Sequence, residues 1–458
     1  MRTDSRSLFF SPNEEYRDFS SVVHDVQEYI SSKYSSLITD GGDDEIKQQV
    51  KRYIGQYLMD YRIAVKDMNS GQLTDAVYSE MAEFSFLTKY IFGAGVEEVN
   101  INSWRDIEVQ YSSGDYVKLD ERFDSPEHAL NVVRRMLHVS GMVLDNTSPA
   151  VLGHIRKNIR VSVMAKPLVD SDAGVSACIR IVNPQHLTKE DFLCGGRATA
   201  EMLDFLACCL RYGISVCIAG ATNTGKTTLT GWLLSTIQNT TRIFTIEDGS
   251  RELAVVKEKD GKVLNSVVQT LTRHSDNEKM NIDQEMLLDM ALRFNPGLIC
   301  IGEMRSAEAY AAQEAARTGH TVLTTIHSNS CEATYRRMCS LCKRKYDIGD
   351  ETLMSFVTEA FPIIVYMKQL ENKQRRIMEI AECEIPESDG FLGTGPRVSR
   401  SLYRYDVRTN QIENNKYVVN GEHRKVSPAS DSLQRRFLEN GMPRQVLNEL
   451  MKGGLATA

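Results

Sequence analysis

The chain has 458 residues, of which 25% are charged and 42% hydrophobic, and its formal net charge is −7. This composition is that of a globular protein and excludes a wholly disordered or fibrous chain. The negative balance argues against a protein that coats nucleic acid, because such domains usually carry a basic excess. The length predicts about two to four domains.

No membrane span or secretion signal is expected. The most apolar stretch, Met202 to Gly220, is interrupted by Asp204 and Arg211, so it is predicted to be core. The N-terminal residues lack the long apolar segment and cleavage site of a signal peptide. The sequence therefore predicts a cytosolic protein.

The ten cysteines are expected to stay reduced in the cytosol. Cys339 and Cys342 form a C-x-x-C pair, but no second pair follows at zinc spacing. They are predicted to be ordinary thiols on a helix.

The first half of the chain changes its hydrophobic period near residue 91. Residues 1–90 space apolar side chains three and four apart, which predicts a helical N-terminal arm, with a helix from Asp75 to Tyr90. Residues 91–184 alternate apolar and polar side chains, and are predicted to form an α/β domain with a first turn at Asn102-Ser103.

Residues 185–199 read as a linker with a hinge at Gly195-Gly196. Residues 200–385 then show continuous apolar strands between helices, which is typical of a parallel sheet covered on both faces. Residues 386–458 are expected to form a C-terminal extension with a short strand at Leu402–Val407 and two helices. The predicted parallel strands are Ser215–Ala219, Ile243–Ile246, Leu298–Ile301, Val322–Ile326 and Ile363–Tyr366.

A phosphate-binding loop follows the first of these strands. The pattern G-x-x-x-x-G-K-[ST] lies between a strand and an amphipathic helix. Its glycines let backbone N–H groups face the phosphates, and the helix directs its N-terminal dipole at them. Lys226 is expected to bind the β- and γ-phosphates, and the Thr227 hydroxyl to ligate Mg²⁺. The predicted nucleotide-binding residues are Gly220, Ala221, Thr222, Asn223, Thr224, Gly225, Lys226, Thr227 and Thr228.

Three more strands end on ionisable residues, and ligands of a parallel sheet bind at the carboxyl ends of its strands. Glu303 follows one strand and is expected to hold the metal through water and to orient an attacking water; alone it would cap a helix. Glu247 and Asp248 follow another, either to position metal or water or to close a turn.

His327 follows the fourth strand and is expected either to sense the γ-phosphate or to be structural. Ser328 or Asn329 is predicted to cap the next helix. His320 starts the same strand, so it should lie on the far edge, with a structural role or facing a neighbour.

The order of Gly220–Thr228, "TIEDGSREL", "ICIGEMR" and "TGHTVLTTIHSNS" resembles the secretion and conjugation traffic ATPases, from about Tyr90 to Gly441. Within them, "GVEEVNINSWRDIEV" and "SLYRYDV…LQRRFLENGMP" look closest to the Flp/Tad pilus (CpaF-like) or conjugal transfer branch. The loop departs from the family pattern at Ala221–Thr224, where Gly-Thr-Gly-Ser is common. The resemblance implies an α/β fold: an N-terminal α/β domain, a linker and a RecA-like P-loop NTPase domain.

The resemblance also implies a homohexameric ATPase that uses ATP and Mg²⁺. It implies inner-membrane secretion or pilus platform proteins as partners, and membrane contact only through them. Arg160 and Arg180 match the family arginines that complete the nucleotide's charge, although either alone would usually be a solvated surface residue.

Two other functions stay open. A nucleic-acid translocase would need basic loops, and Lys343-Arg344-Lys345 is the notable run, although such runs are usually solvated. A nucleotide-gated assembly scaffold would turn over little, which Lys226 and Glu303 argue against. The transported substrate is not indicated.

Overall fold

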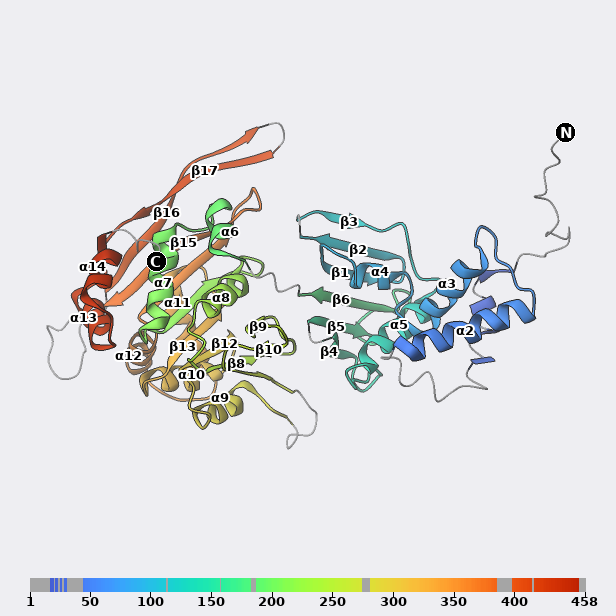
Figure 1. The fold of residues 1–458 in the computed structure, drawn as a ribbon, viewed down its shortest axis with the longest axis horizontal. Helices are drawn as coiled ribbons and strands as arrows, with labels where there is room; N and C mark the ends of the chain where they lie inside the picture. The colour runs from blue at the N-terminus through green and yellow to red at the C-terminus, as the bar shows by residue number, and fades with distance from the viewer. Residues whose placement is uncertain are drawn as a thin grey trace. The chain divides into compact units, whose positions relative to one another are not determined.

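A computed structural model describes most of the chain as two compact units, Met1–Ile181 and Val182–Ala458 (Figure 1). The predicted boundaries at 184 and 385 fall outside the described residues, and the predicted subdivision stays a prediction. Within the described part of the chain, every helix is too short or too polar to cross a bilayer. The described residues are 17–19, 21–23, 25–26, 29–30, 44–112, 114–156, 158–182, 187–273, 281–384, 398–413 and 416–452.

The first unit begins with helices that enclose a small core of their own. Helix α2 spans Asp44–Asp60 and α3 spans Ser70–Ala82. Asn69 and Gln72 form a capping box, which starts α3 earlier than predicted. The predicted helix to Tyr90 is wrong in its extent, because Ser85 has a φ of +56° that an α-helix cannot accommodate. The chain continues as η1 (Ser85–Leu87) and α4 (Thr88–Ile91).

An antiparallel sheet completes the first unit, in the order β3-β2-β1-β6-β5-β4. The predicted alternation is confirmed, because Val99, Ile101, Ile107 and Val109 are all buried. The predicted turn at Asn102-Ser103 is wrong by about two residues: Ser103 pairs with Asp106, so the turn lies between them. The elements are β1 (Val96–Ser103), β2 (Asp106–Tyr111), β3 (Tyr116–Lys118), α5 (Pro126–His138), β4 (Ala150–Arg156), β5 (Ile159–Ala165) and β6 (Val175–Ile181).

The second unit is built on a nine-stranded sheet in the order β11-β8-β12-β13-β7-β14-β15-β16-β17. From β11 to β14 neighbouring strands are parallel, as predicted. The five predicted apolar parallel strands are confirmed, with small shifts at their ends, and β11 is a sixth parallel strand that was not predicted. The parallel strands are β7 (Val216–Gly220), β8 (Ile243–Glu247), β11 (Val267–Leu271), β12 (Leu298–Met304), β13 (Thr321–Ile326) and β14 (Ile363–Gln369).

Helices cover both faces of this sheet (Figure 1). Side chains of β7 show the division: Val216 and Ile218 join one core, and Cys217 and Ala219 the other. The central strands β7, β8 and β13 are therefore buried on both faces, as in the α/β sheet of RecA-like P-loop domains. The helices are α6 (Lys189–Cys194), α7 (Ala200–Arg211), α8 (Lys226–Ser235), α9 (Gln284–Leu292), α10 (Glu308–Arg317), α11 (Cys331–Cys342), α12 (Asp350–Ala360), α13 (Asp431–Glu439) and α14 (Arg444–Lys452).

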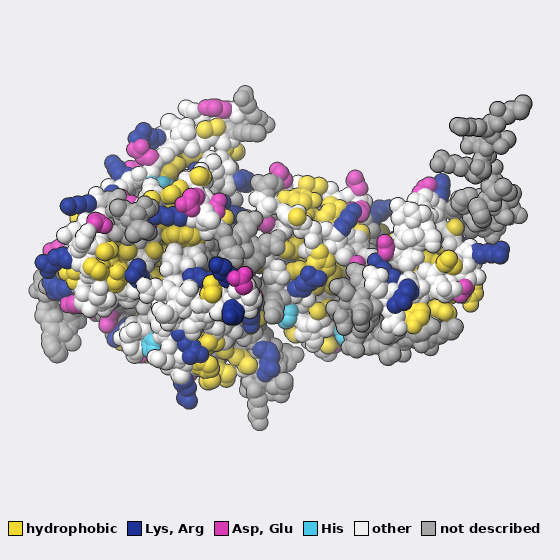
Figure 2. All heavy atoms as spheres, in the orientation of Figure 1, with side chains coloured by type: hydrophobic (Ala, Val, Ile, Leu, Met, Phe, Trp, Pro, Cys, Tyr) yellow, Lys and Arg dark blue, Asp and Glu magenta, His cyan; other side chains and the backbone are white. Residues whose placement is uncertain are grey.

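The C-terminal strands extend the same sheet by antiparallel pairing. They are β15 (Arg375–Glu384), β16 (Val398–Glu413) and β17 (Lys416–Lys425). The predicted strand at Leu402–Val407 is too short, because β16 continues as a solvent-exposed ribbon held by pairing with β17. A small hairpin, β9 (Glu258–Lys259) and β10 (Lys262–Val263), stands apart. Acidic and basic side chains are interspersed on the face drawn in Figure 2.

Candidate nucleotide site

The phosphate loop joins the buried strand β7 to helix α8, as the motif predicts. Gly225 caps the helix with a φ of +93°, which glycine adopts without strain. Gly220 is needed because a Cβ there would lie 2.5 Å from the carbonyl oxygen of Met367 on β14. Asn223, at the crest of the loop, also has a left-handed φ of +63°. The loop conformation thus depends on residues within it and on β14 beside it.

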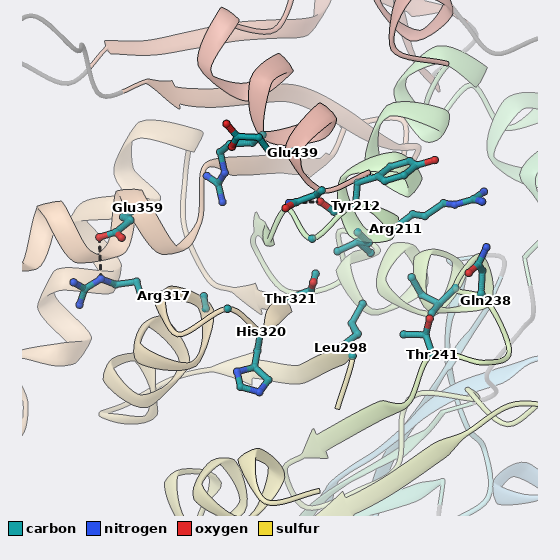
Figure 3. A pocket seen from close by; sticks show the side chains of 18 residues that line it. Arg211, Tyr212, Gln238, Thr241, Leu298, Arg317, His320, Thr321, Glu359 and Glu439 are labelled. Carbon is teal, nitrogen blue, oxygen red and sulfur yellow. Dashed lines mark hydrogen bonds and ion pairs between the residues drawn. The ribbon is translucent and has the colours of Figure 1, made fainter. Parts of the chain in front are cut away.

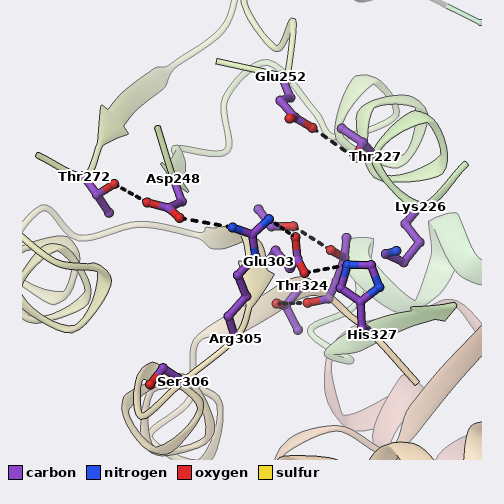
Figure 4. Close-up of polar contacts among 12 residues, drawn as sticks. Lys226, Thr227, Asp248, Glu252, Thr272, Glu303, Arg305, Ser306, Thr324 and His327 are labelled. Carbon is purple, nitrogen blue, oxygen red and sulfur yellow. Dashed lines mark hydrogen bonds and ion pairs between the residues drawn. The ribbon is translucent and has the colours of Figure 1, made fainter. Parts of the chain in front are cut away.

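Lys226 and Thr227 begin α8, and Figure 4 shows the Thr227 side chain pointing toward Glu252. The Lys226 ammonium donates to the carbonyl oxygens of Gly220 at 3.0 Å and Ala221 at 2.8 Å. The Thr227 hydroxyl lies 3.4 Å from a carboxylate oxygen of Glu252. Ala221 and Thr222 are exposed and Thr228 is half-buried, whereas the buried Thr224 hydroxyl donates to the Ala221 carbonyl.

Glu303 is the second-to-last residue of strand β12, whereas it was expected from the sequence to follow the strand. A register shift between Ile301 and Met304 interrupts pairing with β13. The Thr325 hydroxyl donates to the Gly302 carbonyl at 2.7 Å and holds this irregular segment. The interruption lets Glu303 leave the regular pleat at the carboxyl edge of the sheet.

Glu303 belongs to a polar chain that crosses this edge (Figure 4). Arg305 donates to Glu303 at 2.7 Å and to Asp248 at 3.4 Å. Asp248 also accepts from the Thr272 hydroxyl at 2.6 Å. Hydrogen bonding to Glu303 raises the pKa of the Arg305 guanidinium further. Asp248 therefore fixes Arg305, which in turn fixes Glu303.

His327 follows β13 and lies beside Glu303, with 2.9 Å between its Nε2 and Glu303 Oε1. The pair lies at ion-pair distance but lacks hydrogen-bond geometry. Burial, and next the positive charge of Lys226, lower the pKa of the His327 imidazole. The ring is thus neutral near pH 7 and lies between a carboxylate and the loop lysine.

Glu247 ends β8 in a buried position, 2% exposed. One of its oxygens accepts from the backbone N–H groups of Glu252 at 2.6 Å and Leu253 at 2.9 Å. Its other oxygen has no hydrogen-bond partner among the described residues. Burial raises the pKa of Glu247 to about 7. In this structure Glu247 holds the turn that presents Glu252.

Two residues in contact with the site were not singled out in the sequence: Glu252 and Arg305. Glu252 stands within the quoted "TIEDGSREL" and carries a carboxylate three residues after the turn glycine Gly249. Arg305 stands within "ICIGEMR", two residues after Glu303. In each segment the site was assigned from the sequence to a carboxylate closer to the end of the strand.

The site offers oxygen ligands that suit a magnesium ion. The Thr227 hydroxyl and the Glu252 carboxylate already face each other at 3.4 Å, and the Glu303 carboxylate lies at the same edge of the sheet. Mg²⁺ prefers hydroxyl, carboxylate, water and phosphate oxygens. These residues therefore fit the predicted cofactor, with Glu252 added to the predicted Thr227 and Glu303.

Arg160 and Arg180 belong to the other unit, where they are neighbours across β5 and β6. Arg180 is also opposite Glu98 on β1, and Arg160 opposite His154 on β4. These side chains alternate with buried ones, so they point away from the core that α5 covers. Their contact with a nucleotide stays a prediction.

Two predictions near β13 have different outcomes. The predicted cap at Ser328 or Asn329 is wrong: Ser330 caps α11, and its hydroxyl accepts from the Ala333 N–H at 3.0 Å. The cap is therefore one residue later than Asn329, so Ser328 and Asn329 form a short connection between His327 and the capped helix. The placement of His320 at the far edge of the sheet is confirmed.

His320 lines a cavity of about 740 Å³ at the amino end of the parallel strands (Figure 3). Arg317 and Glu359 form an ion pair at 2.9 Å across part of its rim. The phosphate loop is at the opposite strand ends, so this cavity is separate from the nucleotide site.

The run Lys343-Arg344-Lys345 is occupied by internal contacts. Lys343 pairs with Asp350 and Lys345 with Glu285, and Arg344 donates to the Arg305 carbonyl. The C-x-x-C cysteines lie on α11 as predicted, and both are buried thiols outside any disulfide. Burial raises the pKa of Cys342 to about 12.

Comparison with known proteins supplies the family. Residues 150–379 match the family described as Type II/IV secretion system protein. The chain is 28% identical over 345 residues to the uncharacterized protein MJ0900 of Methanocaldococcus jannaschii, covering 72% of this chain and 58% of that protein. It is 29% identical over 196 residues to the type IV secretion system protein VirB11 of Bartonella quintana, covering 40% and 51%.

The chain thus spans little more than half the length of these two relatives. A crystal structure of the pilus retraction motor PilT with bound ADP covers 82% of this chain and 94% of its own, at 18% identity and a TM-score of 0.46. Because the family match covers just over half of the chain and includes the phosphate loop, Glu303 and His327, the protein belongs to the type II/IV secretion system protein family.

Proposed function

We propose that the protein is a Mg²⁺-dependent ATP hydrolase that works as the motor of a secretion, pilus-assembly or conjugative-transfer machine. One observation carries the proposal: Lys226 and Thr227 meet Glu252, Glu303 and His327 at a single edge of the parallel sheet. A phosphate loop, oxygen ligands and a carboxylate beside a neutral imidazole are the groups that phosphoryl transfer to water requires.

Each residue has a role that follows from its contacts. Lys226 exchanges its two loop carbonyls for phosphate oxygens, and the N-terminus of α8 adds its dipole. Thr227 and Glu252, with Glu303 through a water, would hold Mg²⁺, which when bound would neutralise phosphate charge. Glu303, oriented by Arg305, aligns a water and accepts its proton.

Neutral His327 donates a hydrogen bond to the terminal phosphate and reports its presence to Glu303. Asp248 keeps Arg305 in place, and Glu247 shapes the turn that carries Glu252. The predicted catalytic set therefore divides into groups that touch the nucleotide and groups that position them. Arg160 and Arg180 complete the set from the other unit by balancing the charge of the transferred phosphoryl group.

The assembly we propose is a homohexamer in the cytoplasm that contacts an inner-membrane platform and reaches the membrane through those partners. The match to secretion proteins supports this assembly. Direct binding of nucleic acid is not part of the proposal, because each basic residue of 343–345 already has an internal partner.

Phosphate release from ATP tests the proposal. We expect Mg²⁺-dependent hydrolysis, a fall of about 100-fold or more in kcat for Glu303→Gln, and retained ATP binding by that variant. Glu371→Gln, which removes an exposed carboxylate of the same unit, serves as the matched control. Equal background rates in the parent and Glu303→Gln would support the scaffold function instead, and stimulation by single-stranded DNA would support a translocase.

A further inference from the structure

Strand β15, which is distant from the phosphate loop in sequence, forms hydrogen bonds with the crest of that loop. Arg375, the first residue of β15, donates through Nε to the Asn223 carbonyl at 3.0 Å and through Nη2 to the Asn223 side-chain oxygen at 2.6 Å. This is a two-point contact with one residue, which fixes the orientation of Asn223 as well as its position.

This contact is made at a residue whose backbone conformation is energetically unfavourable. Asn223 has a φ of +63°, a region that side-chain-bearing residues avoid and asparagine tolerates best. The side-chain carbons of Arg375 also pack near Gly225, where a Cβ would lie 3.4 Å from Arg375 Cδ. Arg375 therefore supports the left-handed turn on both sides of Thr224.

The next residue along β15 holds a different segment. Arg376, 8% exposed, donates to the Gly195 carbonyl at 2.7 Å. Its guanidinium lies against Gly196, where a Cβ would be 3.4 Å from Nη2. The N–H of Ile377 then donates to the Arg197 carbonyl at 2.9 Å. The start of β15 is thus bonded to the glycine segment 195–197 that precedes α7.

The charges in this region favour an anion in the loop. Arg197 is half-buried, and burial followed by the nearby Arg375 lowers the pKa of its guanidinium. Like charges at short range raise the local positive potential, which phosphate groups would relieve. A phosphate group bound in the loop would therefore act on Arg375 in two ways, through its hydrogen bonds to Asn223 and through the local electrostatic potential.

We propose that Arg375 is a positioning residue that shapes the phosphate loop through Asn223, and that with Arg376 it couples nucleotide occupancy to the glycine segment 195–197. The inference rests on the proposed ATPase function and adds residues to it. Neither arginine is assigned to contact the reacting atoms. What is new is the connection between loop and segment through two consecutive residues of one strand.

Steady-state ATPase kinetics test the first step. We expect Arg375→Ala to raise KM for ATP about tenfold, with kcat changed less than about threefold, because loop geometry affects binding first. In an Asn223→Gly background the same change should raise KM less than about threefold, since the bond to the Asn223 side-chain oxygen is already lost and only the bond to the backbone carbonyl at position 223 remains. Arg375→Lys should recover little, because an ammonium lacks the two-point fork.

Arg404→Ala is the matched control: it removes a half-exposed arginine of β16 that pairs with Glu379 at 3.2 Å, away from the loop. Its KM should equal that of the parent. An unchanged KM in Arg375→Ala, or the same fold-change with and without Asn223, would overturn the positioning role. A parent protein without ATP hydrolysis would instead reject the proposed function.

Hydrogen exchange at residues 195–199 tests the coupling. In the parent, saturating Mg-ADP should change exchange at these amides, whereas Arg375→Ala and Arg376→Lys, compared at saturation, should show no change. Exchange within α13 gives an internal control for intact folding. An undiminished response in both variants would remove the coupling while leaving the ATPase proposal in place.

Discussion

The most informative single substitution is Glu247→Gln. Glu247 is 2% exposed and accepts two backbone hydrogen bonds through one oxygen, while its other oxygen has no hydrogen-bond partner among the described residues. Glutamine keeps an acceptor for the N–H groups of Glu252 and Leu253, and it removes the charge. We expect the variant to be more stable than the parent at high pH.

The magnitude follows from the pKa. Burial raises the pKa of Glu247 to about 7 from the usual 4.5, so between these values the folded state binds more protons than the unfolded state. Stability therefore falls as pH rises from 4.5 to about 7, and the full penalty applies above. At 1.36 kcal/mol per pH unit the penalty is about 3 kcal/mol.

The weaker hydrogen bonds of a neutral acceptor are already contained in this pKa, because the two backbone N–H groups act on it against burial. The net expectation is therefore about 3 kcal/mol of added stability at pH 8 and little or none at pH 4.5, where the parent is itself largely protonated in the folded state. The pH dependence of the difference, rather than its absolute size, identifies the buried charge.

Urea denaturation at both pH values measures this difference. Trp104 lies in the first unit and Trp232 in the core of the second, so a Trp104→Phe background lets fluorescence report the second unit alone. Glu371→Gln controls for removing an exposed carboxylate. The reasoning is refuted if Glu247→Gln gains the same stability at pH 4.5 and pH 8, or loses stability at pH 8.

Three further outcomes are expected. Lys226→Ala should weaken Mg-ATP binding by about 100-fold, the worth of its charge-assisted bonds, in a fluorescent-nucleotide titration; affinity within about threefold of the parent would contradict its role. Glu252→Gln should lower kcat about 100-fold in a phosphate-release assay with KM nearly unchanged; full activity would show that its contact with Thr227 is incidental. Ser430→Ala removes the cap of α13 and a donor to the buried Glu382, so urea denaturation should show a loss of about 2–3 kcal/mol, and no loss would mean that water replaces the hydroxyl.

The sheet of the second unit was largely predictable from local sequence. Continuous apolar runs such as Val322–Ile326 have no polar face, so they indicate strands buried on both sides, and parallel strands bring their carboxyl ends to one edge. Gly220, Glu247, Glu303 and His327 were expected there for this reason. Their strands are parallel neighbours in the structure, with β7, β13, β12 and β8 adjacent.

What escaped prediction depends on contacts distant in sequence or on local irregularity. Arg375 lies 152 residues from Asn223, and no periodicity links them. Glu252 is presented by a turn whose shape depends on the buried carboxylate of Glu247. The length of β16 was missed because its outer half is exposed on both faces, so pairing rather than burial defines it, and alternation carries no signal there.

The close approach of Gly220 to Met367 has a consequence for protein engineering. The loop and the β14–β15 hairpin are pressed together so tightly that a single added carbon would collide with backbone. Hybrid proteins assembled from related sequences should therefore inherit both segments from one parent, since a crossover between them would pair surfaces that were never selected to fit. Mutational libraries would face the same constraint, and changes in the two segments should be varied jointly.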